Sequence, residues 1–379
     1  MRSGFLIALV VCAAEVLAAY NLVKEFSGDT FFDDWTYYGY WDNLTSGDVE
    51  FLSRANATAD KLTYVNDAGR AIIKVDNTTD VLYNYKRNSV RISSNDSYPV
   101  GAIIVFDAYH IPYGCSVWPS FWTKGPDWPD YGEIDIIEAV NLMNYNQYAL
   151  HALDGCNKAT SVNQTGTTTS TNCTAASGCV VEETKSNSYG SGFASAGGGV
   201  FVTQFDISGI YLWFWTRSDI PSSITNATDS IDISDWGTPS AAYPNTSCII
   251  DKYFGDQTLI IDITLCGTCF LTICRAGVAS IYNETCTGLC YQDNVIGNGS
   301  NYDTAYFEIS YIKVYGTGSA YASSTASASA SATSTKSSSL SSSTSLSENI
   351  AWISIPVELF MNVMYSCQNV GHAFSTHFI

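Results

Sequence analysis

The sequence predicts an all-β domain in which many short strands form a sandwich or a jelly roll. Short β-branched and aromatic runs recur along the chain, and glycine, asparagine, aspartate and proline separate them. No segment carries the long 3.6-residue period that would predict an extended helix. Many short strands without long helices favour two packed antiparallel sheets. The clearest strand candidates are residues 71–75, 89–92, 101–106, 133–138, 200–205, 209–216, 258–265 and 306–315.

One strand candidate is unusual because it carries three carboxylates separated by isoleucines. In a regular strand Glu133 and Asp135 share one face and Glu138 points to the other, because side chains alternate. The run contains one isoleucine more than strict alternation needs. A β-bulge at Ile136-Ile137 would return Glu138 to the face of the other two acids. We therefore expect an acidic row on one face of this strand.

Such a row has three interpretations: a solvated sheet face, a Ca²⁺ site, or a catalytic site. A solvated face fits poorly because aromatic residues crowd the segment, namely Trp118, Phe121, Trp122, Trp128 and Tyr131. Neighbouring acids in a cleft repel one another, so at least one should keep its proton near neutral pH. Glycoside hydrolysis needs one ionised carboxylate and one protonated carboxylic acid, and we favour catalysis for this reason.

The same residues carry a family resemblance. Gly132-Glu133-Ile134-Asp135-Ile136-Ile137-Glu138, preceded by Trp118-Pro119-Ser120-Phe121-Trp122 and Trp128-Pro129, resembles the E-[IV]-D-I-[IV]-E signature of glycoside hydrolase family 16. It is most similar to the fungal endo-β-1,3(4)-glucanases, or laminarinases, over about residues 20–315. The resemblance implies a concanavalin-like β-jelly roll of two antiparallel sheets with a concave cleft for β-glucan. A transglycosylase of the same family and a lectin-like binding protein are the alternatives.

The resemblance also implies roles for the three acids. Glu133 would be the nucleophile and Glu138 the general acid/base, while Asp135 would orient and tune the pair. A retaining mechanism needs the two catalytic carboxyl groups only about 5–5.5 Å apart. We expect Asp135 to stay charged and to raise the pKa of Glu138.

Five further residues are predicted to bind substrate. Trp122 and Trp128 are the best candidates for stacking on sugar rings, and Trp118 follows, with core packing as the alternative for each. Arg91 matches a family arginine at the donor end of the cleft, although a surface ion pair is the alternative. His151 follows the motif at the family's spacing and would lie near the acids, although a lone histidine is more often structural.

The charge of the chain excludes some partners. The formal net charge is −19 and the isoelectric point is near 4.3. These values argue against binding to nucleic acid and to an anionic membrane surface, and they are compatible with a neutral β-glucan polymer. No cofactor and no metal is expected, and we expect the protein to act as a monomer.

The chain divides into four predicted parts. Residues 1–18 read as a secretory signal peptide, and residues 19–316 as the catalytic domain without a transmembrane segment. Residues 317–347 are rich in Ser and Thr and are typical of an O-glycosylated stalk. The tail, 348–379, is of unclear nature, and its apolar run is interrupted by Glu358 and ends polar, so a lipid anchor is not favoured. The protein is expected to be secreted, with cell-wall association left open.

Glycosylation signals and cysteines support secretion. Ten sequons begin at Asn43, Asn56, Asn77, Asn95, Asn163, Asn172, Asn226, Asn245, Asn283 and Asn298. The predicted domain keeps an even number of cysteines, which suggests disulfides of open connectivity. Eight match cysteines of the fungal enzymes: Cys115, Cys156, Cys173, Cys179, Cys248, Cys266, Cys286 and Cys290. Cys269 and Cys274 do not match and lie in residues 268–275, where the family's Asp-Trp pair is absent.

Overall fold

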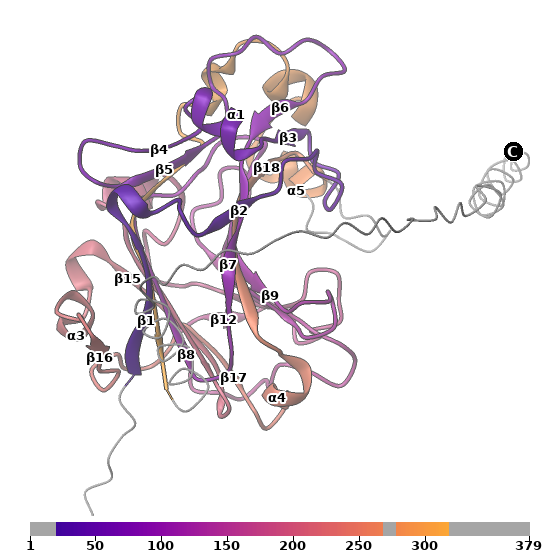
Figure 1. The fold of residues 1–379 in the computed structure, drawn as a ribbon. Coiled ribbons are helices and arrows are strands. Elements are labelled where there is room, and N and C mark those ends of the chain that lie inside the picture. The colour runs from indigo at the N-terminus through magenta and orange to yellow at the C-terminus, as the bar shows by residue number, and fades with distance from the viewer. Residues whose placement is uncertain (1–19, 268–277, 318–379) are drawn as a thin grey trace, which may run out of the picture. The chain divides into compact units, whose positions relative to one another are not determined.

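The computed structural model describes residues 20–267 and 278–317 (Figure 1). The predicted signal peptide and tail lie outside these residues, as do the predicted stalk from residue 318 onward and both unmatched cysteines, Cys269 and Cys274. The predictions for these parts therefore stay predictions.

Two large antiparallel sheets make up the described domain. The nine-stranded sheet has the order β16-β1-β19-β8-β14-β15-β17, with β5 paired to β19 and β4 paired to β5. Its strands are β1 Tyr20–Ser27, β4 Thr63–Val65, β5 Ala71–Lys74, β8 Ala102–His110, β14 Gly199–Asp206, β15 Gly209–Thr216, β16 Ser230–Ile231, β17 Ala241–Pro244 and β19 Tyr306–Gly316.

The eight-stranded sheet has the order β12-β13-β11-β10-β9-β18-β7-β2. Its strands are β2 Trp35–Tyr37, β7 Arg91–Tyr98, β9 Val117–Lys124, β10 Glu133–Glu138, β11 Gln147–His151, β12 Thr167–Thr168, β13 Cys179–Glu182 and β18 Gln257–Leu265. A small parallel pair joins β3 Val49–Phe51 to β6 Arg87–Ser89. The acidic motif therefore lies on a strand with partners on both sides, β9 and β11.

The helices of the described residues are short and lie in connections. The α-helices are α1 Arg54–Ala59, α2 Gly190–Ser195, α3 Ser222–Thr225, α4 Ile250–Tyr253 and α5 Val278–Thr285. The other helical turns are η1 Gly28–Thr30, η2 Arg217–Asp219, η3 Tyr291–Val295 and η4 Gly299–Tyr302. Among these residues, no helix has the length and apolar character needed to cross a bilayer.

The core lies between the two sheets, as in a sandwich. Phe106 of β8 and Phe121 of β9 come from different sheets, and their ring centroids are 4.4 Å apart. The predicted all-β class is confirmed, and the predicted strands 133–138 and 209–216 match β10 and β15 to the residue. The predicted strand 89–92 is divided between two strands in the structure: Ser89 ends β6, which pairs with β3, and Arg91 begins β7, which pairs with β18 and β2.

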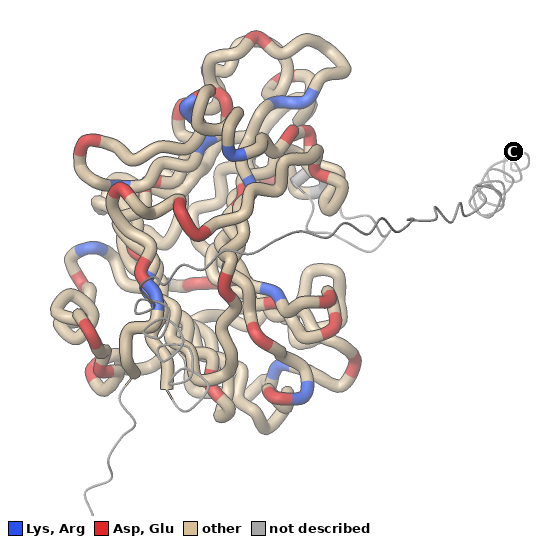
Figure 2. Tube along the Cα trace, in the orientation of Figure 1, with Lys and Arg blue, Asp and Glu red and all other residues tan. Residues whose placement is uncertain are grey.

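The outer faces of the two sheets differ. The nine-stranded sheet buries its outer face under a second apolar cluster that includes Trp213, Trp215 and Trp236. On the eight-stranded sheet, β10 turns its isoleucines to the core, and its carboxylates therefore occupy the opposite face. Figure 2 shows many acidic and fewer basic residues over the described domain.

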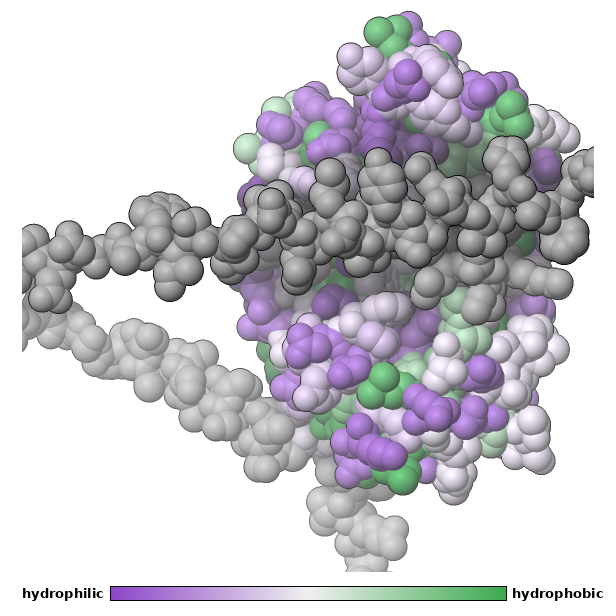
Figure 3. Space-filling model, turned by 90° about the vertical axis from the view of Figure 1, so that its right-hand side faces the viewer, coloured by the Kyte–Doolittle hydropathy of each residue, from purple (hydrophilic) through white to green (hydrophobic). Residues whose placement is uncertain are grey.

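Four disulfides connect the eight cysteines that match the fungal enzymes. The pairs are Cys115–Cys286, Cys156–Cys248, Cys173–Cys179 and Cys266–Cys290. The prediction of disulfides is confirmed for these eight residues, and the structure supplies the connectivity that the sequence left open. On the face drawn in Figure 3, the coloured part of the surface mixes hydrophilic and hydrophobic residues without one large apolar patch.

Candidate active site

The predicted β-bulge is present in β10. Asp135 lies opposite Ala149 of β11, and Glu138 lies opposite Gln147, so three steps on β10 face two on β11. On the other side, Asp135 pairs with Trp122 of β9 and Ile137 pairs with Phe121, so the register shifts there as well. The bulge thus falls at Ile136-Ile137, where the extra isoleucine predicted it.

The bulge sorts the side chains of β10 into two groups. Ile134, Ile136 and Ile137 are all buried in the core between the sheets. Burial of each isoleucine stabilises the fold by roughly 1.5–3 kcal/mol relative to exposure, so the core holds two successive isoleucines inward. Because both point inward, Glu138 leaves the core and joins the face of Glu133 and Asp135.

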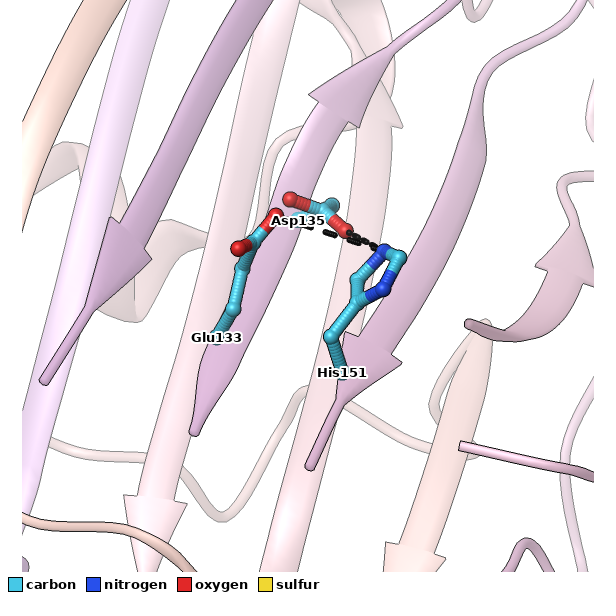
Figure 4. Close-up of side chains that lie close together, drawn as sticks. All are labelled: Glu133, Asp135 and His151. Atoms are coloured by element: carbon cyan, nitrogen blue, oxygen red, sulfur yellow. Dashed lines mark ion pairs between the residues drawn. The ribbon is translucent and has the colours of Figure 1, made fainter. Parts of the chain in front are cut away.

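Two acids and one histidine meet on this face. Figure 4 shows Glu133 and Asp135 on one strand and His151 on the neighbouring strand, with their polar ends directed toward one another. The Nε2 atom of His151 lies 3.3 Å from an Asp135 oxygen and 4.0 Å from a Glu133 oxygen. The pairing of Glu133 with His151 across β10 and β11 produces this meeting. The predicted proximity of His151 to the acids is confirmed.

Burial and charge shift the pKa values of this group. Burial would lower the pKa of His151, but the neighbouring carboxyl groups of Glu133 and Asp135 outweigh it and raise the pKa to about 10. Asp135 is only 3% exposed, and burial together with Glu133 raises its pKa well above the usual value. Burial therefore opposes the predicted charged state of Asp135, whereas the neighbouring His151 favours it.

Glu138 has its own surroundings at the other end of the row. The Trp118 indole donates a hydrogen bond of 3.1 Å to one of its carboxyl oxygens, and Gln147 donates one of 3.3 Å to the other. Burial raises the pKa of Glu138; His151, Gln147 and Trp118 oppose that rise, while Glu133 adds to it. The neighbouring acid that raises the pKa of Glu138 is thus Glu133, rather than Asp135 as we expected.

Trp122 stands in a second polar cluster beside the acids. Its indole donates a hydrogen bond of 3.2 Å to Asp262, and the same Asp262 oxygen lies 3.0 Å from the Arg91 guanidinium. The Arg91 guanidinium also lies 5.0 Å from the centre of a Trp122 ring, within the range of a cation–π contact. Arg91 and Asp262 are both buried, so this pair is not the surface ion pair that was the alternative. Burial raises the pKa of Asp262 to about 6, against the opposing effects of Arg91 and Trp122.

The other two tryptophans have different exposures. Trp128 is 58% exposed, and its indole donates a hydrogen bond to Glu133, so its ring lies at the acidic row with a free face. Trp118 is only 8% exposed and packs with Val140, Tyr282 and Cys286. The burial of Trp118 leaves little aromatic surface for a sugar, and the structure favours a role in holding Glu138 instead.

The hairpin turn before β10 depends on a glycine. Gly132 has a φ of +72°, which L side chains rarely adopt, and a Cβ there would lie 2.3 Å from the Phe254 ring. Gly132 accepts a hydrogen bond of 2.9 Å from Gly125, which closes the turn that carries Trp128. The turn therefore sets both the start of β10 at Glu133 and the placement of Trp128.

The geometry also bears on the two non-catalytic interpretations, a solvated sheet face and a Ca²⁺ site. The side chains of Glu133 and Asp135 are 14% and 5% exposed, so the acids do not form a solvated face. Ligand atoms of Glu133, Asp135 and His151 lie within 4.8 Å of one another, close enough to share a metal ion. However, Ca²⁺ takes six to eight oxygen ligands, and this set contains an imidazole.

Two residues of the site were not predicted from the sequence. Asp262 lies within the strand candidate 258–265 and was not singled out as a site residue. An acid inside the apolar run Leu259-Ile260-Ile261-Asp262-Ile263 could have indicated a functional side chain. Gln147 begins β11 and contacts Glu138 only because of the shifted register. No local pattern indicates that contact.

Comparison with known proteins identifies the family. The family model described as an XgeA-like, catalytic GH16 domain matches residues 35–315. A probable glycosidase of Schizosaccharomyces pombe is 39% identical over 78% of this chain and 69% of its own length. A probable endo-1,3(4)-beta-glucanase of Aspergillus niger is 36% identical over 81% of this chain, which spans only 41% of that relative.

A solved structure agrees with these relatives. Laminarinase 16A of Phanerochaete chrysosporium, solved with two beta-glucans in its donor and acceptor sites, is 35% identical with a TM-score of 0.72. The match covers 79% of this chain and 100% of that one. The match to the family model, the identity to curated relatives and the likeness of fold all concern the same described domain. The chain belongs to glycoside hydrolase family 16, within the group of XgeA-like catalytic domains.

Proposed function

We propose that this protein is a retaining endo-β-1,3(4)-glucanase that hydrolyses β-glucan through a covalent glycosyl-enzyme intermediate. The observation that carries the proposal is the bulge in β10, which sets Glu138 on the same face as Glu133 and Asp135. Relatives named as endo-1,3(4)-beta-glucanases support the substrate class.

In the proposed first step, a Glu133 oxygen attacks the anomeric carbon while Glu138 gives its proton to the leaving glycosidic oxygen. The raised pKa of Glu138 suits this role, because a general acid must still hold its proton at the working pH. The Trp128 indole, which donates a hydrogen bond to Glu133, orients the attacking carboxylate. The products of this step are a glycosyl ester on Glu133 and a free sugar hydroxyl.

In the second step, Glu138 removes a proton from water, and the resulting oxygen attacks the anomeric carbon from the opposite side of the ester. The C–O bond to Glu133 breaks, which frees the carboxylate and gives a product of retained configuration. His151 and Asp135 position the pair, and Trp122 and the exposed face of Trp128 are the proposed sugar-stacking surfaces. The Arg91–Asp262 pair fixes the ring of Trp122.

The proposed setting is extracellular. Four disulfides within the described residues fit an oxidising compartment, since such bonds are rare in the cytosol. A glucan-containing cell wall is the proposed place of action, and a monomer is the proposed functional form.

A digest screen tests the function directly. Purified protein should release oligosaccharides from laminarin and lichenan but not from galactan, and the Glu133→Gln variant should release none. Proton NMR of fresh product should show the β-anomer first. Release from galactan alone, or initial formation of the α-anomer, would contradict the proposal. Products longer than the substrate in the presence of acceptor oligosaccharides would show transfer in place of hydrolysis.

A further inference from the structure

The bulge in β10 is held by the side chain of one buried residue, Asn146. Its Oδ1 atom accepts a hydrogen bond of 3.0 Å from the backbone N–H of Glu138, and its Nδ2 atom donates one of 3.0 Å to the carbonyl of Ile136. A bulge interrupts the regular ladder, so backbone groups beside it need other partners. The Asn146 amide supplies a donor and an acceptor on the two sides of Ile137, as a neighbouring peptide group would.

Asn146 is itself held on both sides by its backbone. Its backbone N–H donates a hydrogen bond of 3.0 Å to the hydroxyl of Ser188, and its backbone carbonyl accepts one of 2.9 Å from the backbone N–H of Glu183. Asn146 and Ser188 are both 0% exposed, so water does not compete for these contacts. The next residue, Gln147, donates to the Glu138 carboxyl group. Residues 146 and 147 therefore hold both the backbone and the carboxyl group of Glu138.

We propose that Asn146 is a positioning residue that sets where the Glu138 carboxyl group stands relative to Glu133. This inference rests on the proposed role of Glu138 as general acid/base. Without the amide, the bulge loses the partner that fixes the backbone from Ile136 to Glu138. Ile136 and Ile137 remain inside the core, and Glu138 keeps its contacts to Trp118 and Gln147, but the backbone that carries its side chain is no longer fixed. A displacement of about 1 Å at a reacting group costs on the order of 100-fold in rate.

The chain offers a matched control on the other sheet. Asn66, in the turn between β4 and β5, accepts hydrogen bonds of 3.0 Å from the backbone N–H groups of Ala68 and Arg70. Its Nδ2 atom donates a bond of 3.0 Å to Glu308. Asn66→Ala therefore removes an amide whose oxygen also accepts hydrogen bonds from the backbone, and whose nitrogen donates to a side chain of the nine-stranded sheet. It reports what loss of such an amide does to the fold alone.

The first test compares two substrates. Laminarin needs protonation of a poor leaving group, whereas an aryl β-glucoside oligomer with a low-pKa phenol does not. Added azide attacks the glycosyl ester on Glu133 without a general base and yields a glycosyl azide. Asn146→Ala should lose about 100-fold in kcat/KM on laminarin and less than about tenfold on the aryl substrate with azide. Asn66→Ala should change neither rate by more than a few-fold, and the alkaline limb of kcat/KM should move only in Asn146→Ala.

Equal loss on both substrates, or no loss on either, would overturn the positioning role. A second measurement tests the positioning role of Asn146 without an activity assay. Hydrogen–deuterium exchange should speed up in Asn146→Ala for peptides covering residues 136–140 and stay unchanged in β8 and β15. Unchanged exchange at 136–140 would refute the inference whether or not the wild type is active. A wild type that is inactive on every glucan would refute only the proposed function.

A variant of similar size guards against a failure to fold. Asn146→Leu keeps the approximate size but offers neither an acceptor to the Glu138 N–H nor a donor to the Ile136 carbonyl. It should show the same substrate dependence as Asn146→Ala, with faster exchange at 136–140. Wild-type behaviour of Asn146→Leu in both measurements would contradict the need for the amide and would overturn the inference.

Discussion

His151 should contribute stability that disappears as the pH rises. The imidazole lies between two carboxylates, and its pKa in the folded protein is about 10 against an ordinary value of 6.5. A group that binds its proton more tightly in the folded chain stabilises it fully below the unfolded pKa. That stabilisation is lost as the pH rises toward the folded pKa, so the window here runs from pH 6.5 to about 10.

The size of the effect follows from the two pKa values. The full difference corresponds to on the order of 5 kcal/mol of unfolding free energy. Within this window the contribution falls by about 1.4 kcal/mol per pH unit. Between pH 6.5 and pH 9, the stability difference between wild type and His151→Gln should therefore shrink by about 3 kcal/mol.

The assay is urea unfolding followed by tryptophan fluorescence at several pH values, for wild type and His151→Gln. His110 provides a control of opposite sign, because burial lowers its pKa and the folded chain keeps it neutral. The stabilisation by a neutral His110 is lost as the pH falls below 6.5, so the His110→Gln difference should grow with pH there and then stay level. A stability difference between wild type and His151→Gln that does not change between pH 6.5 and 9 would refute the raised pKa of His151 in the folded protein.

The remaining predictions concern the proposed reaction. Glu133→Gln and Glu138→Gln should each lower kcat on laminarin by at least about 100-fold with unchanged circular dichroism; full activity in either would contradict its role. Trp128→Ala should raise KM for long oligosaccharides by roughly tenfold or less, since one stacking face is lost; an unchanged KM would remove Trp128 from the sugar surface. The alkaline limb of kcat/KM should lie above pH 4.5, because activity falls as Glu138 loses its proton at a raised pKa; a limb at or below that pH would contradict the assignment.

The features that could be predicted from the sequence are local ones. The spacing of Glu133, Asp135 and Glu138, with two successive isoleucines, is enough to predict the bulge, because side-chain alternation and the preference for buried isoleucine act within six positions of one strand. The strand character of β10 follows in the same way from β-branched residues.

Contacts that depend on strand register were not predictable in the same way. Asp262 reaches Trp122 and Arg91 because β18 lies between β7 and β9, an order that no local pattern contains. Asn146 contacts Glu138 because the connection between β10 and β11 places Asn146 beside the bulge. The choice between sugar stacking and core packing for Trp118 stayed open in the sequence, since its burial depends on packing against Cys286, which is far along the chain and bonded to Cys115.

The surroundings of Glu138 contain neutral donors where those of the neighbouring acids contain cationic side chains. Among the described residues, the cationic side chains of Arg91 and His151 pair with acids of this face other than Glu138. Arg91 lies 3.0 Å from Asp262, and His151 lies 3.3 Å from Asp135. Glu138 receives hydrogen bonds from two neutral donors and has no cationic side chain within 4.0 Å in the described part of the chain. Protonation of Glu138 removes a buried charge without breaking an ion pair, in agreement with its raised pKa and with its proposed role as the general acid.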